Sequence, residues 1–322
     1  MEIMLTLSDI QSTREKIAPY IVRTPMKRSR TLSDELGANV HIKMELFQKT
    51  GSFKPRGAFA QMLALNEEQR ARGVVAWSGG NFAQGVAYAA FILEVDALIV
   101  MPETTPQNYL DATRGYGATI ELAKDITAAS ARMEELAAQG RAKLHPYDNP
   151  DMMAGAGSLG LEILEDLPGA TDILVSIGGG GLIGGVITAV KALKPDVRIW
   201  GVETLGAETM SESLKAGKVI PYVPSSLART LSAPYVSAEA LTLCQQHMHD
   251  LILVSDAEAF RAQRFLLERL KQLTELAASC TWAAAQKVKD QFTPDSTVCL
   301  VLCGGNVSFE DLVNYGKLFD KG

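Results

Sequence analysis

The sequence predicts an α/β protein with two domains, each an open, twisted sheet of mostly parallel strands with helices on both faces. Short apolar segments alternate with amphipathic helical segments along most of the chain, which is typical of parallel sheets. The 322 residues suffice for two domains, and 47% of them are hydrophobic against 21% charged, the balance of a globular chain. No tandem repeat and no linker rich in proline, glycine or serine interrupts this order.

The first series of elements occupies the N-terminal half of the chain. Each expected strand is a short apolar run, and each expected helix is a longer segment with helical periodicity. We expect strands at 73–77, 96–101 and 118–122, and helices over 82–93, from Pro106 and over 126–139.

The second series begins after an irregular segment, 145–156, where Pro146, Pro150 and several glycines interrupt the alternation. The segment 255–258, Ser-Asp-Ala-Glu, has the spacing of a capping box that opens a helix. We expect strands at 171–177, 197–203, 251–254 and 297–302, and a helix over 182–193.

Composition and charge exclude several function classes. The net charge of −6 and the lack of a basic block argue against nucleic acid as a partner. No apolar run reaches the roughly 18 residues that span a membrane, and residues 1–14 lack the order of a signal peptide. The four cysteines form no C-x-x-C pair, so we expect reduced thiols and a cytoplasmic location.

A run of four glycines, Gly178, Gly179, Gly180 and Gly181, precedes Leu182 at a strand-to-helix turn. Glycine lets the backbone approach an anion closely, and the free N–H groups of the helix N-terminus favour phosphate. A second interpretation is open: Gly179, Gly181 and Gly184 satisfy G-x-G-x-x-G, and Glu203 follows about 20 residues later, as in a dinucleotide site.

The segment 51–58 contains Lys54 directly before a proline, at a predicted helix start. The helix dipole disfavours a positive charge there, which makes a neutral, Schiff-base-forming amine easier to reach. A lone loop lysine is usually only solvated, but this one has Phe53 and small residues beside it.

Two further turns are candidates for ligand binding. In the segment 78–85, the loop of Ser78, Gly79, Gly80 and Asn81 suits a carboxylate, and Asn81 can donate to a phenolate oxygen, although an ordinary helix cap explains it equally well. Cys303 begins Cys-Gly-Gly-Asn at the carboxyl end of a strand, where it either faces a heterocyclic nitrogen or packs as a small apolar side chain.

Taken together, these segments resemble the serine/threonine dehydratase group of pyridoxal-phosphate enzymes, which also contains serine racemase and has the tryptophan-synthase β-type fold (fold type II). The resemblance covers nearly the whole chain. The matching motifs, in chain order, are S-F-K-x-R-G-A at 52–58, S-x-G-N-x-A-Q-G at 78–85, A-G-x-G-x-x-x-L-E at 154–162, G-G-G-G-L at 178–182 and C-G-G-N at 303–306.

The resemblance implies a role for each of these positions. Lys54 holds pyridoxal 5′-phosphate as a Schiff base and removes the Cα proton of the substrate. Phe53 flanks the ring, Asn81 binds the ring oxygen and the loop 78–81 binds the substrate carboxylate. The segment 178–182 holds the phosphate, and Cys303 faces the pyridine nitrogen, where a thiol leaves the ring a weaker electron sink than a carboxylate would.

Three positions depart from the family pattern. Phe82 stands where the family usually has histidine, so we expect a more apolar pocket. The family's cation site implies Glu203 and Ala207 as ligands, but Thr209 replaces its aspartate, which argues against a divalent or monovalent cation. Arg229, in place of an aspartate, either recognises a second acidic group on the substrate or, as we favour, makes a surface ion pair.

The sequence therefore predicts a lyase that deaminates a β-hydroxy amino acid such as L-threonine or L-serine to a 2-oxo acid and ammonia. The alternatives are an amino-acid racemase on the same scaffold, a nicotinamide oxidoreductase, and a non-catalytic binder, against which the intact Lys54 argues. We expect a large cofactor-binding domain of residues 1–68 and 150–322, a small domain of residues 69–149 that closes over the substrate, and a homodimer.

Overall fold

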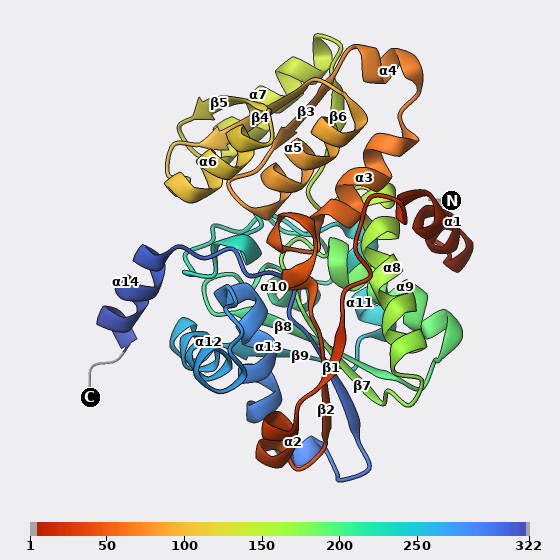
Figure 1. Cartoon of the computed structure of the whole chain (residues 1–322), viewed down its shortest axis with the longest axis vertical. Coiled ribbons are helices and arrows are strands. Elements are labelled where there is room, and N and C mark those ends of the chain that lie inside the picture. The colour runs from red at the N-terminus through yellow and green to blue at the C-terminus, as the bar shows by residue number, and fades with distance from the viewer. Residues whose placement is uncertain (1–4, 320–322) are drawn as a thin grey trace.

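The computed structural model describes residues 5–319 and contains two sheets, one above the other in Figure 1. The smaller sheet has the order β5-β4-β3-β6, and all its neighbouring strands are parallel. Its strands are β3 (Val74–Trp77), β4 (Ala97–Pro102), β5 (Thr119–Ala123) and β6 (Ala142–Leu144).

The larger sheet has the order β1-β2-β10-β7-β8-β9, and only β1 pairs antiparallel with its neighbour. Strands from both ends of the chain lie side by side in it, because β2 pairs with β10. Its strands are β1 (Met26–Arg28), β2 (Asn39–Lys43), β7 (Asp172–Ser176), β8 (Arg198–Thr204), β9 (Asp250–Val254) and β10 (Thr297–Val301).

Helices cover both faces of each sheet (Figure 1). Alternate residues of β3 show this for the smaller sheet, since Val74 and Ala76 pack into the main core with α5, whereas Val75 and Trp77 pack against α7. The helices around the smaller sheet are α3 (Lys54–Ala64), α4 (Glu67–Ala71), α5 (Asn81–Leu93), α6 (Gln107–Gly115) and α7 (Ile126–Ala138).

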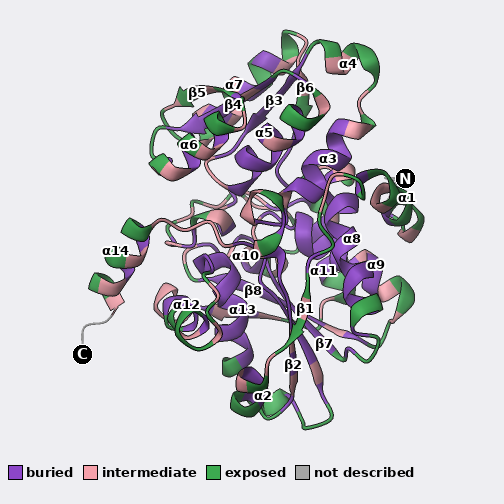
Figure 2. Cartoon of the chain, viewed as in Figure 1, coloured by how far each residue is buried: buried purple, intermediate pink, exposed green. Residues whose placement is uncertain are grey.

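On the larger sheet, α8, α9 and α11 lie on one face and α12 and α13 on the other (Figure 1). The central strands of both sheets are buried, whereas the edge strands β1 and β5 contain no buried residue. Exposed residues gather on the outer sides of the helices (Figure 2). The remaining helices are α1 (Leu7–Ile17), α2 (Arg30–Leu36), α8 (Pro150–Asp166), α9 (Gly181–Leu193), α10 (Thr209–Ala216), α11 (Ala238–His247), α12 (Asp256–Leu270), α13 (Leu276–Lys287) and α14 (Phe309–Phe319).

The α/β fold class is confirmed, and each predicted strand and helix lies within about two residues of an observed one. The capping box at 255–258 is also present, because the Ser255 side chain accepts from the Glu258 backbone and Glu258 accepts from the Ser255 backbone. No helix among residues 5–319 is long and apolar enough to cross a membrane. The domain boundaries near 68 and 150 stay a prediction.

The glycines that follow Pro150 do not interrupt regular structure, contrary to the expectation from sequence. They lie inside α8, where a side chain would collide with neighbouring helices: a Cβ at Gly155 would lie 2.3 Å from the Arg56 carbonyl oxygen, and one at Gly160 2.9 Å from Ala189 Cβ. The glycines therefore allow close helix packing, which outweighs their low helix propensity.

Candidate active site

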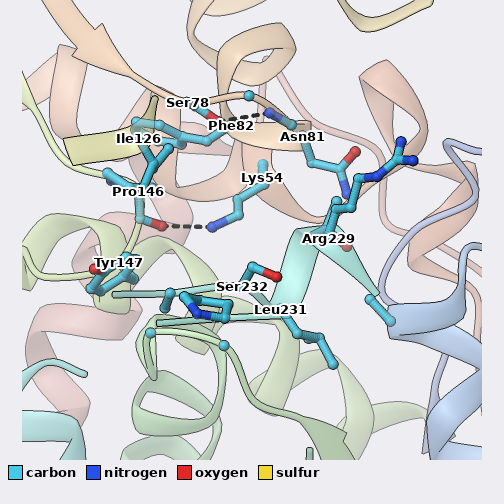
Figure 3. Close-up of a pocket in the computed structure, with 18 of the residues that line it drawn as sticks. Lys54, Ser78, Asn81, Phe82, Ile126, Pro146, Tyr147, Arg229, Leu231 and Ser232 are labelled. Carbon is cyan, nitrogen blue, oxygen red and sulfur yellow. Dashed lines mark hydrogen bonds between the residues drawn. The ribbon is translucent and has the colours of Figure 1, made fainter. Parts of the chain in front are cut away.

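A cavity of about 500 Å³ opens where strands of both sheets end. β3 leads into Ser78, β7 into Gly178 and β10 into Cys303, so all three sequence-predicted turns line it. The carboxyl ends of strands in open α/β sheets are the usual position of ligand sites. Lys54 lies in the middle of this group (Figure 3).

The glycine loop, residues 178–181, forms one wall of the cavity, and neighbouring residues pack directly against its backbone. A Cβ at Gly179 would lie 2.2 Å from Tyr147 Cγ, and one at Gly180 would lie 2.5 Å from Ala240 Cβ. Gly180 also has a φ of +97°, a conformation that disfavours other residues. The loop ends at the N-terminus of α9, whose free N–H groups and positive dipole end suit a phosphate.

Lys54 is the first residue of α3, and Pro55 follows it as predicted. Its Nζ donates a hydrogen bond of 2.6 Å to the Pro146 carbonyl oxygen (Figure 3). The Nζ atom also lies 5.0 Å from the centroid of the Phe53 ring and 5.6 Å from that of Phe82. Removal from bulk water lowers the pKa of Lys54 to about 8, although Cys303 and Glu275 oppose this shift. Burial is thus the main cause of the lowered pKa, and the contribution of the helix dipole stays a prediction.

The helix that carries Lys54 is anchored by a buried ion network around Arg56. The Arg56 guanidinium donates to Glu45, on the segment after β2, and to Glu162 on α8, over distances of 2.8 to 2.9 Å. All three side chains are buried. Removing one partner of such a network leaves a buried charge unpaired, so the network fixes α3 against α8.

Asn81 begins α5, and its side chain is already engaged by Glu275, which lines the cavity, and by Asn306. Its Nδ2 donates to both carboxylate oxygens of Glu275 at 2.9 and 3.0 Å, and its Oδ1 accepts from Asn306 Nδ2 at 2.8 Å. Beside it, Ser78 Oγ accepts from the Gly80 backbone at 3.1 Å. These contacts hold the loop 78–81 in the cavity wall, and whether Asn81 binds a ring oxygen stays a prediction.

Glu275 is a cavity residue that the sequence analysis missed. It is 5% exposed and accepts hydrogen bonds from Asn81 and from Thr230 Oγ1, the latter at 2.8 Å. Burial raises the pKa of Glu275 to about 7, although the bonds from Asn81 and Thr230 oppose the shift. Its signal in the sequence is a lone acidic residue at the start of the otherwise uncharged segment 273–286.

Cys303 also lines the cavity, and its Sγ accepts a hydrogen bond from Ser176 Oγ at 3.3 Å. Burial raises the pKa of the Cys303 thiol to about 12, so the thiol stays neutral near neutral pH. All four cysteines are free and buried in this structure.

The residues expected at a cation site do not fit one. The Glu203 carboxylate is buried and accepts from the backbone N–H groups of Met210 and Ser211, at 2.7 and 2.9 Å. Burial raises the pKa of Glu203 to about 8. Thr209, which stands at the position of the missing aspartate, donates a hydrogen bond to the Ala233 carbonyl oxygen within the same chain. Among the three expected ligand positions, Glu203 is thus the one carboxylate, whereas a hard cation prefers several anionic oxygens.

Arg229 forms the ion pair that the sequence analysis favoured. Its guanidinium lies 3.4 Å from the Asp311 carboxylate on α14, and about half of its side chain is exposed at the rim of the cavity.

Comparisons with known proteins agree with this geometry. A family model for pyridoxal-phosphate dependent enzymes matches residues 17–304. A catabolic L-threonine dehydratase of Staphylococcus aureus is 38% identical over 99% of this chain and 93% of its own length. The structure of maize serine racemase has a TM-score of 0.92 and 32% identity, with 98% of each chain covered. The structure of threonine deaminase isoform 2 from Solanum lycopersicum has a TM-score of 0.91 and 32% identity, with 97% of this chain and 92% of that chain covered.

Proposed function

The chain belongs to the family of pyridoxal-phosphate dependent enzymes, and we propose that Lys54 is the amine through which it holds this cofactor. The glycine loop supports the proposal, because its backbone leaves no room for side chains and ends at a helix N-terminus suited to a phosphate. The family assignment argues against the nicotinamide alternative that rested on Gly179, Gly181, Gly184 and Glu203.

The reaction is a pyridoxal-phosphate dependent β-elimination, as in an ammonia-lyase that acts on threonine or serine. When bound, the cofactor's aldehyde reacts with amines, and its ring withdraws electrons from the carbon that bears the amine. Lys54 is suited to move the Cα proton, because its lowered pKa keeps a fraction of the amine neutral near neutral pH. The single observation that carries the proposal is this lysine beside the glycine loop.

Other residues of the cavity have supporting roles in this proposal. The N–H groups of the loop 78–81, at the start of α5, bind the substrate carboxylate. Glu275 and Asn306 hold the Asn81 amide that faces the cofactor ring. Phe53 flanks that ring, and the neutral Cys303 thiol lies against its nitrogen, which favours prompt loss of the β-hydroxyl over prolonged charge at Cα.

Racemisation is the second candidate, because serine racemases are among the similar structures. It requires a proton donor on each face of Cα. By the resemblance, the second donor of serine racemase falls at Gly79, which has no side chain. A Cβ at Gly79 would lie 3.0 Å from Thr105 Oγ1, a buried hydroxyl with no hydrogen-bond partner in the described structure. A serine there would therefore require Thr105 to shift by a few tenths of an ångström, and the Thr105 hydroxyl would then lie near the new one.

The test is to incubate the holoenzyme with L-threonine and L-serine and to measure 2-oxo acid, ammonia and the chirality of the remaining substrate. We expect the wild-type protein to release 2-oxo acid and ammonia with negligible inversion of the remaining substrate. We expect the Lys54→Ala variant to be inactive. The Gly79→Ser variant is expected to gain some inversion. Substantial inversion of the substrate by the wild-type protein would show that racemisation, and not elimination, is the main activity.

We further propose a homodimer, a small domain of residues 69–149 that closes over the substrate, and a cytoplasmic location. Exposed apolar side chains such as Val223 and Phe309 support self-association, and the free cysteines support a reducing compartment. Sedimentation at several protein concentrations tests the assembly, and a purely monomeric protein would contradict it.

A further inference from the structure

One side of the cavity belongs to a hydrophobic cluster that is separate from the main core. This second cluster joins β3 and α7 to residues from beyond the smaller sheet, and Ile126 packs against its edge. Its buried members are Val75, Trp77, Val100, Ala129, Met133, Leu136, Tyr147 and Ala233. Four residues of this group, Trp77, Ile126, Tyr147 and Ala233, line the cavity, and we call them the apolar wall.

Contacts within the protein position the apolar wall. Ile126 is the first residue of α7, whose N-terminus is capped by Asp125 through a hydrogen bond from Ala128 N to Asp125 Oδ1 of 2.8 Å. The Tyr147 ring packs on Gly179. The Trp77 ring makes an edge contact with the Tyr147 ring, at a centroid distance of 6.4 Å. These contacts give the wall a defined shape that can discriminate between side chains.

The wall lies close to the reacting centre. Pro146, whose carbonyl accepts from Lys54 Nζ, directly precedes Tyr147 in the chain. Phe82, whose ring centroid is 5.6 Å from Nζ, adds an apolar surface at the same end of the cavity, where Figure 3 shows Ile126 beside Phe82 and Pro146. A substrate held at Lys54 would thus have apolar surface within reach of its Cβ.

Charged partners for a substrate side chain are scarce on this side. Among the described residues that line it, the one charged group is Asp125, and its carboxylate caps α7. Arg229 lies beyond Asn81 from Lys54 in Figure 3 and is paired with Asp311. A charged side chain would therefore lose hydration without gaining a charged partner, whereas an apolar one would cover the wall.

Building on the β-elimination proposed above, we propose that the preferred substrate is a β-hydroxy α-amino acid that carries an aromatic or branched alkyl group on Cβ. The hydrogen of serine and the methyl of threonine cover little of the wall. Because one methylene in an apolar pocket changes selectivity about 10-fold or more, phenylserine should exceed serine in kcat/KM by at least about 10-fold.

The first experiment measures binding without turnover. L-Phenylalanine, L-leucine and L-alanine have no β-hydroxyl to lose, so their dissociation constants follow from the absorbance change of the holoenzyme. We expect phenylalanine and leucine to bind at least about 10-fold more tightly than alanine. Equal affinities would overturn the proposal.

A matched pair of variants tests the wall itself. Ile126→Ser should weaken the binding of phenylalanine about 10-fold and leave the binding of alanine unchanged. Ile92→Ser, on the exposed side of α5, should change neither affinity. An Ile126→Ser variant with wild-type selectivity would contradict the role of the wall.

The second experiment compares kcat/KM for serine, threonine, β-hydroxyleucine, phenylserine and β-hydroxyaspartate. A preference for β-hydroxyaspartate that Arg229→Gln abolishes would place the substrate side chain at Arg229 and overturn the proposal. If phenylalanine binds selectively but no member of the series yields a 2-oxo acid, the apolar subsite is supported and the proposed elimination activity is contradicted.

Discussion

The cavity has two walls that are built in different ways. The wall on the larger sheet consists mainly of backbone, where four consecutive glycines lead into α9 and neighbouring residues leave no room for side chains. The wall on the smaller sheet consists of side chains, Trp77 and Ile126 among them. A backbone wall fits a constant group such as a phosphate, while a wall of side chains can change its specificity by substitution.

The backbone wall should be the less tolerant of the two. Gly179→Ala places a Cβ 2.2 Å from Tyr147 Cγ, and overpacking of this kind costs about 3 kcal/mol. The apoprotein can relieve this clash by moving the loop, a movement that phosphate binding must reverse, so we expect cofactor affinity to fall by up to about 100-fold. Gly169→Ala is the matched control, because no atom lies within 4 Å of its Cβ position. Titration of each apoprotein with pyridoxal phosphate measures the effect, and equal affinities for the two variants would contradict the close packing of the loop.

Glu275 links Asn81 to Thr230 through hydrogen bonds, and its removal should have an intermediate effect. Glu275→Gln keeps an acceptor for Asn81 and Thr230 but removes the charge, and hydrogen bonds to charged groups contribute about 1.5–3 kcal/mol. We expect kcat to fall about 10-fold with little change in KM, and the pH profile of kcat to lose a limb near the Glu275 pKa of about 7. An unchanged profile would mean that Glu275 only supports the fold.

The environment of Lys54 should appear in the pH dependence of cofactor uptake. The neutral amine is the reactive form, and burial lowers the pKa of Lys54 to about 8. The rate at which apoprotein takes up pyridoxal phosphate should therefore rise with pH up to about 8 and then level off. A rate that keeps rising towards pH 10, as for an exposed lysine, would contradict a buried amine.

The smallest effect is expected from cations. Because Glu203 and Thr209 are already hydrogen-bonded within the protein, EDTA, Mg²⁺ and K⁺ should leave the melting temperature unchanged. Thr209→Asp restores a carboxylate and should make the melting temperature rise with Mg²⁺. A Mg²⁺-dependent rise in the wild-type protein would show that these residues bind a cation after all.

The difference between the walls also explains what the sequence could predict. Lys54 and the glycine run stand out in sequence because covalent attachment and close backbone approach each require one residue type. Glu275 and Ile126 do not, because their roles depend on which distant segments the fold brings together. The role of the α8 glycines could not be predicted from sequence for the same reason: whether they break a helix or allow packing depends on Arg56 and Ala189, which lie far away in sequence.

The most direct test of the account is to identify the residue that holds the cofactor. Purified holoenzyme should be yellow, and reduction with borohydride followed by peptide mapping should find the pyridoxyl group on Lys54 alone. The Lys49→Ala variant, which lacks an exposed lysine nearby in sequence, should carry the pyridoxyl label like the wild-type protein. The Lys54→Ala variant should carry no label. A pyridoxyl group on any other lysine would contradict the assignment of Lys54 and the mechanism built on it.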